Sequence, residues 1–246
     1  MMKVIVTKNY EEMCQKAARI IAAQITLKED SVLGLATGST PIGIYADLVK
    51  KYEDGVLDFS EICTVNLDEY VGLGGDHEQS YRYFMNHHLF DHINIPKQYT
   101  YVPDGLCEDA EDECDSYELL IQQLGGVDLQ LLGLGANGHI GFNEPSDRFE
   151  TETHVCALSD STVEANSRFF DSKDAVPKSA ITMGIGTIMQ AKKILLVANG
   201  EGKAKAIQQM LFDPVTPQCP ASILRFHQDV TVIVDEAAFS LAAEQE

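Results

Sequence analysis

Short apolar runs alternate along the chain with longer stretches in which hydrophobic residues recur at helical spacing. The apolar runs predict six strands, over residues 4–6, 32–36, 62–67, 127–132, 193–198 and 230–234. The helical patterns lie between them, over about 9–25, 80–90, 108–124 and 202–211, with one more helix beginning near Pro41. Strands that are nearly apolar throughout are typical of a parallel sheet covered on both faces. The sequence therefore predicts an α/β fold, an open, mostly parallel Rossmann-like sheet with helices on both faces.

The segment over about 145–180 interrupts this alternation. It is polar and irregular, and it lies between two predicted core strands. A long insertion of this kind is more often an active-site lid than a structureless connection. Because we find no repeat and no linker rich in proline and glycine, we expect a single domain over residues 1–246 with an inserted lid at about 145–180.

Four of the predicted strands are followed directly by loops with unusual chemistry. In an open parallel sheet, ligands bind beyond the carboxyl ends of the strands, so four such loops would meet at one edge. We expect one binding site there. The loops are Thr37-Gly-Ser-Thr-Pro41, Asn66-Leu-Asp-Glu-Tyr70, Gly133-Leu-Gly-Ala-Asn-Gly-His-Ile-Gly-Phe-Asn-Glu-Pro145 and Asn199-Gly-Glu-Gly-Lys203.

The first and fourth loops each lead into a helix, and free N–H groups at a helix start favour an anion. The first loop contains Thr37, Gly38, Ser39 and Thr40, and by itself it could equally be an ordinary turn. It lacks the G-x-x-x-x-G-K-[ST] pattern of a nucleotide P-loop. In the fourth loop, Lys203 stands where a cation opposes the helix dipole, so a bound anion would explain its position better than helix stability does.

The third loop matches the dinucleotide fingerprint at Gly133, Gly135 and Gly138, but no helical pattern follows the glycines. The loop is therefore interpreted as a glycine-rich turn that presents polar side chains at its end, Asn137, His139 and Glu144. A histidine with a carboxylate within reach suits proton transfer near neutral pH. In the second loop, the adjacent side chains of Asp68 and Glu69 diverge, so we expect at most one of them to face the site.

Composition limits the class of partner. The 246 residues include 38 acidic and 18 basic ones, for a formal net charge of −20. Nucleic acids and anionic membranes bind clustered Lys and Arg, so we expect neither as a partner. The six cysteines form no C-x-x-C pair, and charged residues interrupt any signal-like run at the start, so we expect reduced thiols and a cytoplasmic protein. His88 and His92 are one helical turn apart without an evident third ligand, and we expect no metal site.

Taken together, the loop motifs and the later Ala-Asn-Ser-Arg-Phe-Phe stretch resemble the glucosamine-6-phosphate deaminase family, in the same order over nearly the whole chain. The Gly-His-Ile-x-Phe-Asn-Glu-Pro stretch is the most specific part. The resemblance implies a reaction without a cofactor, in which glucosamine 6-phosphate and water give fructose 6-phosphate and ammonia by aldose–ketose isomerisation and deamination.

The same resemblance implies a role for individual residues. His139, oriented by Glu144 and Asn137, would open the sugar ring. Asp68 would move a proton from C2 to C1. The phosphate would bind four residues at the two helix starts and in the lid: Ser39, Thr40, Lys203 and Arg168.

Two departures from the family pattern bear on regulation and on His139. Many members have Asp at the position of Asn137, and we expect activity to persist with the neutral residue. In the longer, allosterically activated members, basic residues after Asn-Glu-Pro bind an activator phosphate. This chain has Asp147, His154 and Cys156 at the matching positions. We therefore expect a monomer or a small homo-oligomer rather than a hexamer.

Two alternatives stay open at this point. One is 6-phosphogluconolactonase, which is similar in fold but usually has Asp-Glu-Arg at positions 68–70 and lacks the Phe-Asn-Glu-Pro ending. The other is a non-catalytic sugar-phosphate sensor, which would have no reason to keep Asp68, His139 and Glu144 together.

Overall fold

The computed structural model describes residues 2–158 and 176–245. Its main feature is a sheet of seven strands, all paired in parallel, which confirms the predicted α/β class. In spatial order the strands are β1 (Met2–Thr7), β10 (Val230–Asp235), β9 (Ile194–Ala198), β6 (Leu129–Gly133), β2 (Val32–Leu35), β3 (Cys63–Asn66) and β5 (Thr100–Tyr101).

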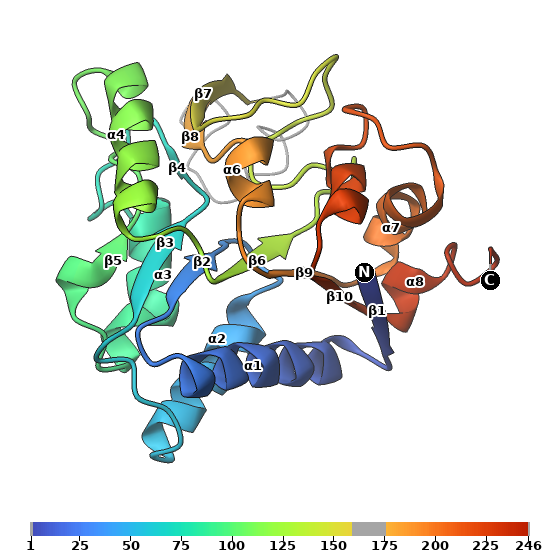
Figure 1. Ribbon diagram of the computed structural model, residues 1–246, viewed down its shortest axis with the longest axis horizontal. Coiled ribbons are helices and arrows are strands. Elements are labelled where there is room, and N and C mark those ends of the chain that lie inside the picture. The colour runs from blue at the N-terminus through green and yellow to red at the C-terminus, as the bar shows by residue number, and fades with distance from the viewer. Residues whose placement is uncertain (1, 159–175, 246) are drawn as a thin grey trace.

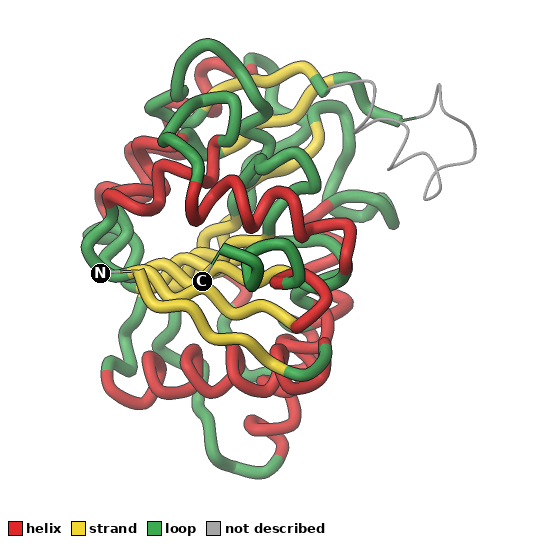
Figure 2. The backbone as a smooth tube through the Cα atoms, turned by 90° about the vertical axis from the view of Figure 1, so that its right-hand side faces the viewer, coloured by secondary structure: helices red, strands yellow, loops and turns green. Residues whose placement is uncertain are grey.

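Helices lie on both sides of this sheet, as Figure 2 shows. In the view of Figure 1, α1 and α2 lie below the strands and α4 and α6 lie above them. The helices are α1 (Tyr10–Leu27), α2 (Ile42–Glu53), α3 (Tyr81–His88), α4 (Ala110–Gln123), α6 (Ile185–Met189), α7 (Ala204–Phe212) and α8 (Glu236–Phe239).

Central strands β9 and β2 are apolar throughout, as expected where helices remove both faces of a strand from water. All five residues of β9 are buried, as are all four of β2. At the start of α1, the side chain of Asn9 accepts the Glu12 N–H at 2.9 Å, and Glu12 in turn accepts the Lys8 N–H. The helix therefore begins where the sequence indicates, directly after β1.

A second, three-stranded antiparallel sheet was not anticipated from the sequence. It consists of β4 (Asp68–Tyr70), β8 (Ser179–Thr182) and β7 (His154–Ala157), with β8 in the middle. Two expectations were therefore wrong: Asp68 and Glu69 belong to a strand rather than a loop, and the 145–180 segment is not irregular throughout. Strands this short carry too few alternating positions to stand out as a pattern.

The predicted lid is only partly covered by the described residues. Its two ends belong to the small sheet, through β7 and β8. The part over 159–175, with the phosphate ligand Arg168 that the resemblance implies, lies outside the described residues. The lid and the single-domain organisation therefore stay predictions.

Candidate active site

The four loops singled out from the sequence follow β9, β6, β2 and β3, which are neighbours in the sheet. Because these strands are parallel, their carboxyl ends lie at the same edge. This is the edge at which open α/β sheets bind ligands. The side chains of the four loops are thus brought to one region by the fold.

The first and fourth loops are joined directly. Thr40 Oγ1 donates to Asn199 Oδ1 at 2.9 Å, so the two helix starts lie side by side. Gly38 and Gly200 have φ angles of 96° and 84°, which a residue with a side chain adopts only under strain. The loops that contain Thr37, Ser39 and Lys203 therefore turn sharply at this edge, directly before α2 and α7.

Tyr10, on α1, is hydrogen-bonded to the first loop. Its hydroxyl lies 3.0 Å from the Thr40 carbonyl oxygen and 3.2 Å from that of Ser39, and it accepts the Gly43 N–H at 2.9 Å. Sequence reasoning missed this residue, since nothing near Tyr10 in the chain marks it as a partner of a loop 30 residues away.

Lys203 is the last residue of a short 3-10 turn (Glu201–Lys203) and the N-cap of α7. Burial lowers the pKa of its ammonium group, and within the described residues no carboxylate acts against this effect. A partly buried cation at a helix start is doubly unfavourable, through desolvation and through the helix dipole. An anion bound between the two loops would remove both costs.

The third loop holds a connected triad. One oxygen of the Glu144 carboxylate accepts from Asn137 Nδ2 at 2.6 Å, and the other lies 3.3 Å from His139 Nδ1. Asn137 Oδ1 also accepts the His139 N–H at 3.2 Å. The loop thus holds the backbone of His139 and brings the Glu144 carboxylate within ion-pair distance of its ring.

The glycines of this loop make room for that arrangement. A Cβ on Gly135 would lie 2.4 Å from the His139 ring atoms, and one on Gly138 would lie 2.7 Å from Cys219 Sγ. Gly138 also has a φ of 89°. The fingerprint glycines therefore serve the packing of His139 and of the loop, in a turn that no helix follows.

Asp68 borders the same loop from β4. A Cβ on Gly141 would lie 3.6 Å from Asp68 Oδ2, so the carboxylate reaches the loop of His139. Asp68 is 6% exposed, and burial, with a smaller contribution from the Glu69 charge, raises its pKa to about 8. Such a carboxyl is poised to exchange a proton near neutral pH.

Glu69 points away from Asp68, and its carboxylate binds backbone N–H groups. Its carboxylate accepts three backbone N–H groups, from Tyr70, Tyr81 and Arg82, at 2.8–2.9 Å. Two of these donors belong to the first turn of α3, so Glu69 ties β4 to that helix. Of the two adjacent acids, Asp68 is the one that reaches the third loop.

An aromatic cluster encloses the inner side of this region. The rings of Tyr70 and Tyr81 lie 4.8 Å apart, and the Tyr81 and Phe142 rings are stacked at 6.0 Å. These rings belong to a small hydrophobic cluster separate from the main core. Of these rings, Tyr81 lies close enough to Asp68 to feel its charge.

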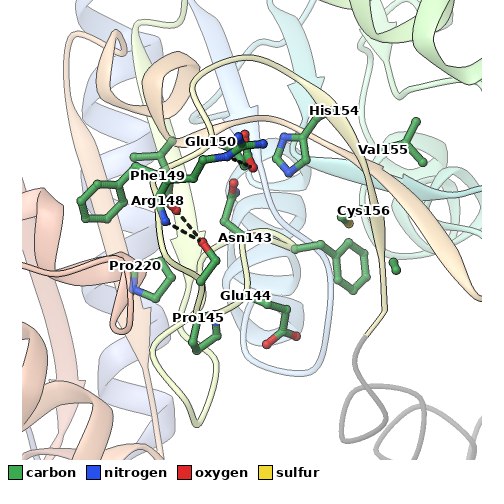
Figure 3. A pocket seen from close by; sticks show the side chains of 14 residues that line it. Asn143, Glu144, Pro145, Arg148, Phe149, Glu150, His154, Val155, Cys156 and Pro220 are labelled. Carbon is green, nitrogen blue, oxygen red and sulfur yellow. Dashed lines mark hydrogen bonds and ion pairs between the residues drawn. The ribbon is translucent and has the colours of Figure 1, made fainter.

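A cavity of about 230 Å³ lies beyond Glu144, on the side of the loop that faces β7 (Figure 3). Its wall includes Glu144, Arg148, His154 and Cys156, and Asp68 and His139 are not part of it. Arg148 Nε donates to Glu150 Oε1 at 2.7 Å, so the guanidinium already has an acidic partner. The cavity therefore offers little uncompensated positive charge to an anion.

Comparisons with known proteins agree with this geometry. The family model "Glucosamine-6-phosphate isomerases/6-phosphogluconolactonase" matches residues 7–233. The chain is 58% identical over 240 residues to a glucosamine-6-phosphate deaminase from Clostridium perfringens, covering 98% of this chain and 99% of the relative. It is 60% identical over 232 residues to one from Lachnoclostridium phytofermentans, covering 94% and 98%.

Two solved structures resemble this chain, one closely and one in fold only. A monomeric glucosamine-6-phosphate deaminase is 49% identical with a TM-score of 0.95, over 98% of this chain and all of the other. A 6-phosphogluconolactonase from Trypanosoma cruzi is 23% identical with a TM-score of 0.80, over 98% and 96%, and this likeness concerns the fold alone. The chain belongs to the family of glucosamine-6-phosphate isomerases and 6-phosphogluconolactonases.

Proposed function

We propose that this protein is a glucosamine-6-phosphate deaminase, which converts glucosamine 6-phosphate and water to fructose 6-phosphate and ammonia. The observation that carries the proposal is the approach of a buried, weakly acidic carboxyl, Asp68, to the loop in which Glu144 holds His139. Relatives that are 54–60% identical over nearly the full length have this name.

The substrate phosphate binds between the first and fourth loops. Ser39 and Thr40 offer hydroxyl and backbone N–H groups at one helix start, and Lys203 supplies the cation at the other. Arg168 is a further proposed ligand that would approach from the lid. Binding at this point directs the sugar along the edge of the sheet toward Asp68 and His139.

Ring opening comes first, since the C2 hydrogen becomes acidic only when C1 is a carbonyl. His139 moves the proton between the ring oxygen and the anomeric hydroxyl. The Glu144 carboxylate lies 3.3 Å from Nδ1 of the imidazole and orients the ring, and Asn137 holds Glu144 in place. A positioned proton-transfer group of this kind typically contributes about 10²–10⁴-fold to the rate.

Isomerisation follows at Asp68. The carboxylate takes the C2 proton and returns it to C1, so the double bond passes through an enolamine to an imine at C2. Water then adds to the imine carbon, and ammonia leaves. Each step uses side chains of this chain and water, and it calls for no cofactor.

The two other functions considered are less well supported. The 6-phosphogluconolactonases among the similar structures are 19–23% identical, against 49% for the deaminase. A non-catalytic sensor would gain nothing from keeping Asp68 buried at a cost in stability.

The proposed form of the enzyme is a cytoplasmic monomer. The similar deaminase structure is of a monomeric protein, and all six cysteines here are free thiols, as expected in a reducing compartment. Over residues 2–158 and 176–245, the structure has no helix long and apolar enough to span a membrane.

The proposal is tested by incubating the purified protein separately with glucosamine 6-phosphate and with 6-phosphogluconolactone, without added cofactor. We expect ammonia and fructose 6-phosphate in equal amounts from the first substrate and no hydrolysis of the second beyond the spontaneous rate. If the protein consumes only the lactone, the proposed deaminase function is wrong and the protein is a 6-phosphogluconolactonase.

A further inference from the structure

The small antiparallel sheet carries Asp68 on its edge strand β4. In the pairing of β4 with β8, Asp68 is directly opposite Thr182. Residues opposite one another in an antiparallel pair project to the same face of the sheet. The Thr182 side chain is therefore the cross-strand neighbour of the Asp68 carboxylate, and it is fully buried.

The Thr182 hydroxyl also contacts the loop of His139 and Glu144. Its Oγ1 accepts the Phe142 N–H at 3.0 Å. A Cβ on Gly141 would lie 2.9 Å from Thr182 Oγ1 and 3.6 Å from Asp68 Oδ2, so both oxygens border the same point of the loop. The absence of a side chain at Gly141 allows this close approach.

The backbone of the next residue, Met183, makes two hydrogen bonds, one to the third loop and one to the residue before Asp68. Its carbonyl accepts from Asn143 Nδ2 at 2.8 Å, and its N–H donates to the Leu67 carbonyl at 2.7 Å. Asn143 Nδ2 also donates to the Ile140 carbonyl. The end of β8 is thus bonded on one side to the residue before Asp68 and on the other to the third loop.

We propose that Thr182 is a positioning residue that sets the distance between Asp68 and the loop of His139 and Glu144. This inference rests on the proposed function and deepens it. Both groups must act on one sugar, His139 at the ring oxygen and Asp68 at C2, so their separation has to match the substrate. A misplacement of about 1 Å can cost about 10²-fold in rate.

The Thr182 hydroxyl accepts a hydrogen bond that an apolar side chain of the same shape cannot accept. Valine has the shape of threonine but cannot accept the Phe142 N–H, which would leave that buried donor unpaired. An unpaired buried donor is unfavourable, so we expect the loop to shift until the N–H finds another partner. Serine keeps the acceptor and loses only a methyl group.

The test compares Thr182→Val with Thr182→Ser and with a control, Thr64→Val. Thr64 is also a buried strand threonine, and its hydroxyl has no hydrogen-bond partner within the described residues. For each protein we would measure kcat and KM for ammonia release from glucosamine 6-phosphate, inhibition by inorganic phosphate, and amide hydrogen exchange at Phe142.

We expect Thr182→Val to lower kcat by about 10- to 100-fold, with faster exchange at Phe142 and inhibition by phosphate changed by less than about threefold. Thr182→Ser and Thr64→Val should stay within about threefold of the wild type. The inference is overturned if Thr182→Val keeps the wild-type kcat, or if Thr182→Ser loses as much activity as Thr182→Val. A wild-type protein that releases no ammonia would contradict the proposed function itself.

Discussion

Asp68 and Glu69 are adjacent in β4, yet their carboxylates have opposite surroundings. Glu69 accepts three backbone N–H groups and ties the strand to α3. Asp68 lies against the glycine-rich loop beside an aromatic cluster, and burial raises its pKa to about 8. Glu69 is therefore a structural acid and Asp68 a proposed catalytic base. The raised pKa of Asp68 leads to effects that can be measured.

The first consequence is a pH dependence of catalysis. Asp68 must be deprotonated to take the C2 proton, and its raised pKa means that the active form is a minority below about pH 8. We expect kcat/KM, which reports on the free enzyme, to rise about tenfold per pH unit from about pH 6 and to level off near pH 8. A kcat/KM that is flat from about pH 6 to pH 9 would argue against this assignment.

The second consequence concerns the stability of the fold. In the unfolded chain an aspartate has a pKa of about 3.9, so between about pH 4 and pH 8 the folded protein binds a proton that the unfolded chain does not. The wild type therefore loses stability as the pH rises through this window. Asp68→Asn avoids this loss and should be more stable than the wild type by on the order of a few kcal/mol at about pH 9, with a smaller difference at about pH 5.

Urea unfolding of both proteins at the two pH values measures this difference. The control is Asp76→Asn, at an exposed position between β4 and α3, for which we expect no such pH-dependent gain. An equal effect of Asp68→Asn at both pH values would show that the wild-type carboxyl is not held protonated by burial.

Gly135 is predicted to matter through His139. In Gly135→Ala, the new Cβ would lie 2.4 Å from the imidazole, which must then leave its present position beside Glu144. We expect kcat to fall by about 10²-fold or more, while the affinity for inorganic phosphate stays near that of the wild type.

The matched control for this loop is Gly133→Ala, whose Cβ would have no protein atom of the described residues within 4 Å. We expect it to fold as stably as the wild type and to keep most of the activity. Comparable losses of kcat in both variants would mean that the loop tolerates no added methyl group, whatever the position of His139.

Lys203 is predicted to act on binding rather than on chemistry. Lys203→Met removes the partly buried cation and leaves Asp68 and His139 in place. We expect KM for the sugar phosphate and the inhibition constant of inorganic phosphate to rise together, by about 10- to 100-fold, since hydrogen-bonded ion pairs contribute about 1.5–3 kcal/mol. Lys205→Met, at an exposed position two residues later, should leave both constants unchanged. A loss of kcat at unchanged KM would remove Lys203 from the phosphate site.

The sequence predicts six of the seven strands of the main sheet, because inner strands such as β9 are buried on both faces and read as continuous apolar runs. The two-residue strand β5 is too short to form such a run. The site loops were found because each follows directly on one of the inner strands. The resemblance supplied the roles of Asp68 and His139, whereas the dinucleotide interpretation of Gly135 could be rejected from the absence of a following helix alone.

The sequence does not predict the small sheet, and it therefore gives no indication of a role for Thr182. β4 has three residues, two of them acidic, and its partner β8 lies far along the chain. Acidic residues are depleted in strands, and only the tertiary pairing overrides that preference. Tyr10 was missed for a similar reason, since its contact with the first loop depends on how α1 packs beside α2.

Reaction of the protein with glucosamine 6-phosphate in D₂O shows whether Asp68 transfers the C2 proton. We expect one ammonia for each fructose 6-phosphate formed, with solvent deuterium at C1 of the product to the extent that the Asp68 proton exchanges during transfer. We also expect that Asp68→Asn still binds the sugar phosphate but forms neither product. Ammonia release by Asp68→Asn at the wild-type rate, or no ammonia from the wild type, would contradict the account.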